Sequence, residues 1–121
     1  MNVLEEQLNT SKEATCFLLN TVEDVKVIKF DDIICWIAES NYTKIHLQDC
    51  SKIIASKTLK EFEAILNGPN FFRIHHSYLI NLYYIKRIIK TYGCMVELPQ
   101  NIILDVARTR REELLHKIST I

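Results

Sequence analysis

The stretch that decides the fold is Phe71-Phe72-Arg73-Ile74-His75-His76-Ser77-Tyr78-Leu79-Ile80-Asn81, which interleaves large apolar residues with many hydrogen-bond donors. Successive side chains of an extended chain point to opposite faces. The alternation therefore predicts strands whose side chains Phe72, Ile74, Tyr78 and Ile80 enter a core, while Asn81 closes a turn. Three consecutive polar residues, 75–77, interrupt the pattern and predict a bend at the edge of the protein. Polar side chains that project from such a framework are suited to phosphates and base edges.

The length and composition of the chain predict a single domain. With 121 residues, 48% of them hydrophobic, the chain can bury one core but not two ordinary ones. Residues 1–15 are mostly polar and are expected to be a linker or N-terminal tail, with the domain over 16–121. No apolar run approaches the ~20 residues of a membrane span, and the N-terminus lacks the pattern of a signal peptide. We therefore expect a cytoplasmic protein without membrane contact.

Residue types that support catalysis or metal binding form no recognisable pattern in the sequence. The four cysteines, Cys16, Cys35, Cys50 and Cys94, contain no Cys-x-x-Cys pair, so we expect buried or half-buried free thiols. There is no Gly-x-Ser-x-Gly and no His-Glu-x-x-His, and two glycines in the whole chain exclude a glycine-rich phosphate loop. The adjacent histidines 75 and 76 would point to opposite faces of a strand. The sequence thus predicts no enzymatic activity, no metal and no cofactor.

The formal net charge is zero, but the charges are unevenly distributed. Residues 1–50 carry four lysines and nine acids, a net of −5, and residues 51–121 carry eleven Lys and Arg against six acids, a net of +5. The neutral total argues against strong binding to nucleic acid, whereas the asymmetry allows one basic face that binds phosphates. A randomly mixed, solvated surface is the alternative on charge alone.

Short apolar runs separated by turn residues predict a mainly β fold. Strands are expected over 16–20, 25–30, 33–38, 42–47, 52–55, 84–89, 94–98 and 102–106. In strand 42–47, the residues Tyr42, Lys44 and His46 should form a solvated face. Two short helices, one over 57–66 and one near the C-terminus, each begin with a capping-box pattern, Thr58-x-x-Glu61 and Thr109-x-x-Glu112. Their expected apolar faces are Leu59, Phe62, Ile65 and Leu66, and Leu114, Leu115 and Ile118.

Several polar side chains are candidates for contact with nucleic acid. Arg108, at a strand-to-helix junction, can extend into a groove and bind guanine through two hydrogen bonds. Asn41 carries an amide able to recognise adenine, or it serves only as a turn residue that tolerates positive φ. His76 lies in the predicted bend and is the better contact of the two histidines. The candidate phosphate contacts, each of which can also be an ordinary solvated or structural side chain, are Lys44, Lys57, Arg73, His75, Ser77, Arg110 and Arg111.

Four motifs together resemble the LytTR DNA-binding domain, which is found at the C-terminus of many bacterial response regulators. The first is the stretch 72–81 quoted above, followed by Ile85 and Ile88. The others are 32–34 leading to Glu39-Ser40-Asn41-Tyr42-Thr43, the helix start Thr58-Leu59-Lys60-Glu61, and the basic segment 108–115. The resemblance covers residues 16–118, and four ordered motifs at the family's spacing make it specific.

The resemblance implies a mainly β domain of three small antiparallel sheets with two short helices. Its loops are expected to enter successive major grooves of a direct repeat in double-stranded promoter DNA, and to bend the DNA with two copies bound. The family's base contacts fall on Asn41, His76 and Arg108, although the family usually has Arg or Asn where this chain has His76. The resemblance also implies the output domain of a two-component response regulator, with an upstream receiver domain outside this chain.

Two other functions are compatible with the sequence. A protein-interaction module would pair its exposed strand edges with a partner. An RNA-binding domain would stack bases on solvent-facing aromatic residues, which requires Tyr42, Tyr83, Tyr84 and Tyr92 to lie exposed on one sheet.

Overall fold

The computed structural model describes residues 15–20, 22–66 and 68–119, which form a mainly β domain as predicted. The strands are β1 (Cys16–Asn20), β2 (Val25–Lys29), β3 (Ile33–Glu39), β4 (Tyr42–Leu47), β5 (Lys52–Ala55), β6 (Phe71–His75), β7 (Tyr78–Asn81), β8 (Arg87–Ile89), β9 (Met95–Leu98) and β10 (Ile102–Asp105). The α-helices are α2 (Leu59–Ile65) and α3 (Arg111–Ser119), and the short 3-10 turns are η1 (Phe30–Asp32), η2 (Leu82–Tyr84) and η3 (Arg108–Arg110). The tail expected over residues 1–15 lies almost wholly outside the described residues.

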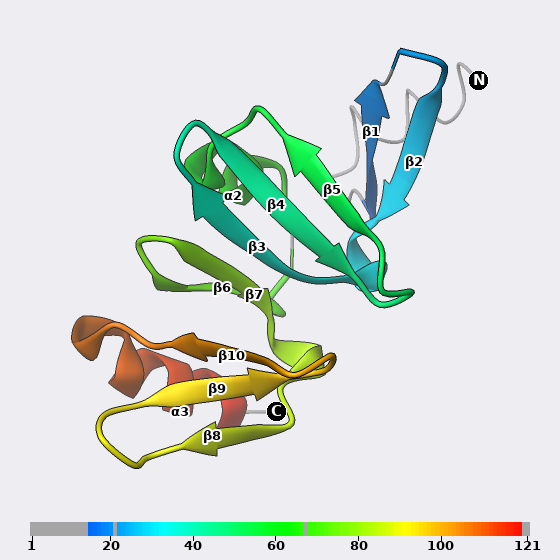
Figure 1. The fold of residues 1–121 in the computed structure, drawn as a ribbon. Coiled ribbons are helices and arrows are strands. Elements are labelled where there is room, and N and C mark those ends of the chain that lie inside the picture. The colour runs from blue at the N-terminus through cyan, green and yellow to red at the C-terminus, as the bar shows by residue number, and fades with distance from the viewer. Residues whose placement is uncertain (1–14, 21, 67, 120–121) are drawn as a thin grey trace.

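The strands form three antiparallel sheets, which confirms the predicted fold class (Figure 1). The central sheet has five strands in the order β5-β4-β3-β7-β6, the second has three in the order β10-β9-β8, and β1 and β2 form a separate hairpin. The stretch quoted first supplies β6, the predicted bend and β7. Because β7 pairs with β3, this stretch joins the β3–β4 hairpin to the rest of the domain.

The five-stranded sheet has a hydrophobic core on each face. Cys35 in β3 belongs to the core shared with the three-stranded sheet and α3. Its neighbour Trp36 belongs to the core shared with α2 and the β1–β2 hairpin. Phe72, Ile74 and Ile80 are buried as predicted. The alternation along β3 and β6 thus holds both cores together.

Local sequence signals explain where α2 begins. The Thr58 hydroxyl accepts a hydrogen bond from the Glu61 amide at 3.2 Å, and the Glu61 carboxylate accepts one from the Thr58 amide at 2.9 Å. The predicted capping box is therefore present. Leu59 and Phe62 are buried as expected, but Ile65 is 39% exposed because α2 ends at that residue.

Other local predictions were wrong where tertiary contacts intervene. The strand expected over 84–89 begins only at Arg87, because the Asn81 side chain accepts from the Tyr83 amide and starts the turn η2. Thr109 is not an N-cap, because the chain enters α3 through η3, whose N-cap is Ala107. The residue Leu115 of the expected apolar face of α3 is exposed.

Two predictions about exposure also need correction. His46 was expected on a solvated face but is buried, since β4 lies between two paired strands and His46 faces Cys35 on one side and Lys52 on the other. The thiol of Cys50 is exposed rather than buried, because it occupies the left-handed position of the β4–β5 turn with φ of 73°. Burial raises the pKa of the Cys35 thiol to about 12.

None of the described helices is both long and apolar enough to cross a membrane.

Candidate nucleic-acid interface

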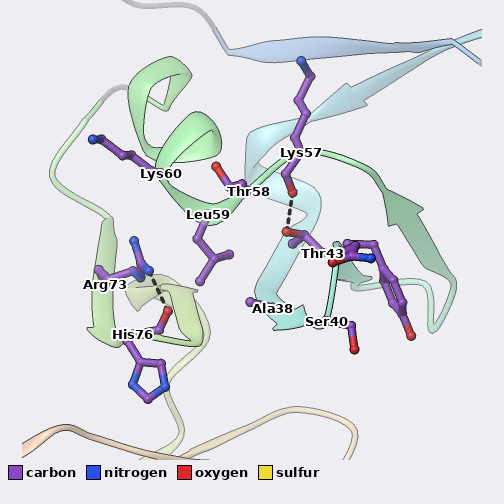
Figure 2. A pocket seen from close by; sticks show the side chains of 11 residues that line it. Ala38, Ser40, Thr43, Lys57, Thr58, Leu59, Lys60, Arg73 and His76 are labelled. Atoms are coloured by element: carbon purple, nitrogen blue, oxygen red, sulfur yellow. Dashed lines mark hydrogen bonds between the residues drawn. The ribbon is translucent and has the colours of Figure 1, made fainter.

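The bend predicted at residues 75–77 is a tight turn at His76 and Ser77, between β6, which ends at His75, and β7, and Arg73 holds this turn in place. Arg73 Nε donates to the His75 carbonyl at 3.0 Å, and Arg73 Nη2 donates to the His76 carbonyl at 2.6 Å (Figure 2). The third nitrogen, Nη1, binds the Glu63 carboxylate of α2 at 2.6 Å. The planar guanidinium suits this arrangement because it presents several donors in fixed directions. Arg73 therefore connects strand β6 both to the carbonyls at the turn and to helix α2.

The side chains of this turn are stacked. The rings of His75 and His76 have centroids 4.2 Å apart, and His75 stacks on Tyr78 at 4.8 Å. His75 Nδ1 accepts a hydrogen bond from the Ser77 amide at 3.1 Å, so the ring proton of neutral His75 lies on Nε2. His75 is half-buried, whereas His76 is exposed. His75 thus has a structural role, and it supports an exposed imidazole at the tip of the turn.

Two backbone hydrogen bonds bring three distant segments to one edge of the domain. The Ala38 amide donates to the Ser77 carbonyl at 2.9 Å, which places the β3–β4 turn beside the β6–β7 turn. The Ala107 amide donates to the Ile74 carbonyl at 2.7 Å, which places η3 on the other side of β6. In Figure 1 these turns lie along the left edge of the molecule. The segments that carry Asn41, His76 and Arg108 are therefore neighbours.

Two open pockets flank the β6–β7 turn. The first has a volume of about 410 Å³ and is lined by Arg73 and His76, which Figure 2 labels. Asn41 also lines it. The second, of about 430 Å³, is lined by Arg73, His76 and Arg110 among others. Arg73 and His76 thus lie between the two pockets. Arg108 is exposed and lines neither pocket, but it directly follows Ala107, which lines the second.

The β3–β4 turn leaves Asn41 available for a contact. The left-handed residue of this turn is Ser40, with φ of 51°, and Asn41 is not among the residues with positive φ. Asn41 is therefore a residue of the turn, as one of the two interpretations holds, but it does not adopt the positive φ that this interpretation invoked. Asn41 is exposed on the surface of the domain.

The candidate phosphate contacts are arranged less uniformly. Figure 2 shows the Lys57 side chain pointing away from Arg73 and His76, while the Lys57 carbonyl accepts from the Thr43 hydroxyl at 2.6 Å. Arg110 lies over the Phe72 ring, with Cζ 5.9 Å from the ring centroid. The Arg111 guanidinium lies against the β8–β9 turn, beside Gly93.

Three acidic residues at this edge were missed by the sequence analysis. Glu39 binds Lys44, Glu63 binds Arg73, and Glu113 binds Arg110. The spacing of Arg110 and Glu113 on consecutive helical turns is a signal that could have found that pair. Nothing local predicts that Glu63 meets Arg73, because β6 and α2 come together only in the folded domain.

Comparisons with known proteins identify the family of this chain. Residues 23–119 match the family described as the LytTr DNA-binding domain. The chain belongs to the LytTR family. It is 34% identical over 92 residues to the sensory transduction protein LytT of Oceanobacillus iheyensis, a match that covers 73% of this chain and 37% of that relative. The chain therefore spans little more than a third of the length of that relative.

The fold is also that of a solved LytTR structure. A LytTr DNA-binding domain from Bacillus cereus superposes with a TM-score of 0.74 at 19% identity, covering 87% of this chain and 97% of the other. The matches do not favour the protein-interaction module. The RNA hypothesis required four tyrosines on one sheet, but Tyr83 and Tyr84 lie in η2, Tyr42 begins β4, and Tyr92 lies in the β8–β9 turn. This chain is a DNA-binding domain of the LytTR type.

Proposed function

We propose that the domain binds a direct repeat in double-stranded DNA as two copies and bends it, with Asn41, His76 and Arg108 reading base edges in successive major grooves. The observation that carries the proposal is the convergence of three turns, fixed by the bonds Ala38–Ser77 and Ala107–Ile74. An Asn amide matches adenine and an Arg guanidinium matches guanine in the major groove. His76 supplies a single donor or acceptor, so its readout is less selective than that of an Arg or Asn.

Arg73 has two roles in this proposal. Nε and Nη2 hold carbonyls at the turn that presents His76, and Nη1, which binds Glu63 in the free domain, is the nitrogen that can exchange this carboxylate for a phosphate. His75 can donate its Nε2–H to a DNA phosphate, since Nδ1 already accepts a hydrogen bond from the Ser77 amide. Phosphate contacts of this kind set the register of a protein on the duplex.

The other proposed phosphate contacts differ in how directly they reach the same edge. Arg110 lines the pocket beside His76, and Lys44 is held by Glu39 next to the β3–β4 turn. Lys57 extends away from the β6–β7 turn, and the Arg111 guanidinium lies against the β8–β9 turn, so each must change its side-chain conformation to reach DNA there. The backbone amide and carbonyl of Ser77 are bonded to His75 and Ala38, so the hydroxyl of Ser77 is its group for a phosphate contact.

We further propose that the parent protein is a cytoplasmic response regulator in which a receiver domain controls this output domain. The match with only 37% of the longer LytT relative supports additional sequence in such proteins. A signal that brings two receivers together would raise the local concentration of the second domain at a repeat, and thereby the avidity. The domain acts in this scheme by binding rather than by catalysis.

Selection of bound duplexes from a random pool tests the proposal directly. We expect a motif that occurs twice in the same orientation, with the two copies spaced by about one helical turn of DNA, roughly 10 bp, or a multiple. The control is a variant with Asn41→Ala, His76→Ala and Arg108→Ala, which should still fold but select no motif. Recovery of unrelated sequences by the wild-type domain would refute sequence-specific binding.

A further inference from the structure

Three of the proposed phosphate contacts are each paired with a carboxylate of the same chain. Lys44 Nζ lies 3.4 Å from a Glu39 oxygen, Arg73 Nη1 lies 2.6 Å from Glu63, and Arg110 Nη1 lies 3.7 Å from Glu113. The three acids come from β3, α2 and α3, so they are brought to this edge separately. The interface that must meet a polyanion therefore contains acids as well as bases.

These carboxylates contribute little to the stability of the fold. The exposed fractions of the side chains of Glu39, Glu63 and Glu113 are 40%, 40% and 53%. Ion pairs this exposed contribute little to stability, because water screens them and ordering two long side chains costs entropy. Their main effect is on DNA binding rather than on stability, because each acid cancels one positive charge and also repels a phosphate.

We propose that Glu39, Glu63 and Glu113 hold down the sequence-independent affinity of the domain for DNA, an inference that rests on the proposed function above. In the free domain each carboxylate neutralises a cation, and when the domain binds DNA the carboxylate competes with a phosphate for that cation, so fewer phosphates are neutralised than there are basic residues at this edge. A single domain then binds any duplex weakly. Stable binding requires the base contacts together with a second copy on the repeat, whose effective concentration supplies the missing affinity.

The inference makes a prediction about the form of the effect. Phosphate contacts carry no sequence information, so removing one carboxylate should raise the affinity for a target duplex and for a scrambled duplex by the same factor. It should also make the salt dependence steeper, because each additional phosphate neutralised changes the slope of log K against log salt by about −0.9. A base-reading residue would instead change the target alone.

The test compares Glu39→Gln, Glu63→Gln, Glu113→Gln and the triple variant, using the duplex recovered by selection and a scrambled duplex of equal length. Dissociation constants are measured over a series of salt concentrations. Each single change should raise both affinities about two- to fivefold at low salt, the range typical of an exposed ion pair. The slope should steepen by up to about 0.9 for each acid removed. Gln keeps the shape of the side chain and removes only its charge.

Glu97→Gln is the matched control. Glu97 also binds an arginine, Arg87, but this pair lies between β8 and β9, and Glu97 sits toward the end of β9 that Figure 1 draws away from the β6–β7 turn. The control should therefore leave both affinities and the slope unchanged. Unfolding curves of every variant show whether the fold is retained. If one single change perturbs the fold, the other two still test the inference, because the three acids lie on separate elements.

Two results would overturn the inference. One is a triple variant that binds the scrambled duplex with the affinity and salt slope of the wild type. The other is a change confined to the target duplex. Failure of the proposed function is a separate result, because the wild-type domain would then prefer no duplex in the selection, whatever the glutamates do.

Discussion

Arg73→Lys tests whether the guanidinium positions the turn that presents His76. The variant keeps the positive charge and the ion pair with Glu63 but removes the planar fork that bonds two carbonyls at once. Each bond from a charged donor is worth about 1.5 to 3 kcal/mol. Because the Arg73 side chain is 21% exposed and a lysine ammonium can keep one of the bonds, we expect the free energy of unfolding to fall by about 1 to 2 kcal/mol.

The effect on DNA binding separates positioning from simple phosphate contact. The charge is unchanged, so the salt slope of binding should stay within error of the wild type. The turn that carries His76 loses one anchor, so the preference at the base that His76 contacts should relax. Urea denaturation measures the first effect, and competition among duplexes that differ at single positions measures the second.

Arg87→Lys is the control for this experiment, since Arg87 is also ion-paired but lies in the three-stranded sheet. It should leave stability within about 0.5 kcal/mol and DNA preference unchanged. An Arg73→Lys variant with wild-type stability and wild-type base preference would refute the positioning role.

Three further predictions follow from the same structure. Arg108→Ala should weaken target binding by about 1 to 3 kcal/mol and relax the preference at one base position, and uniform weakening on all duplexes would contradict base reading. Thr58→Ala removes the capping box of α2 and should lower the free energy of unfolding by about 1 kcal/mol, while the order of preference among duplexes stays the same. The pKa of His46 is lowered by burial and then by Lys52 and Lys44 from its ordinary value of 6.5, so the unfolded chain takes up the proton more readily. The free energy of unfolding should therefore decline as the pH falls below about 6.5, and it should decline less in His46→Gln. Urea titrations at pH 7 and pH 5 measure the decline in each protein. Declines of equal size in the wild type and in His46→Gln would exclude this cause.

The sequence alone determined the class of the fold and most of its elements. Short apolar runs with period two gave the strands, and the pattern Thr58-x-x-Glu61 gave the start of α2. The bend at 75–77 was predicted from three polar residues in a row. These signals are local, because backbone hydrogen bonding and side-chain alternation act over a few residues. Family membership followed from the order and spacing of four motifs.

Only the tertiary structure decided which side chains meet. The pairing of β3 with β7 sets the β3–β4 turn beside the β6–β7 turn, and the bond from Ala107 to Ile74 adds η3. The tertiary structure also made Arg73 an anchor of the β6–β7 turn and placed Glu63 beside it as a partner. It likewise buried His46 in a central strand. Contacts between residues far apart in sequence depend on strand order and helix packing, which no local pattern encodes, and the charge of the binding edge depends on those contacts.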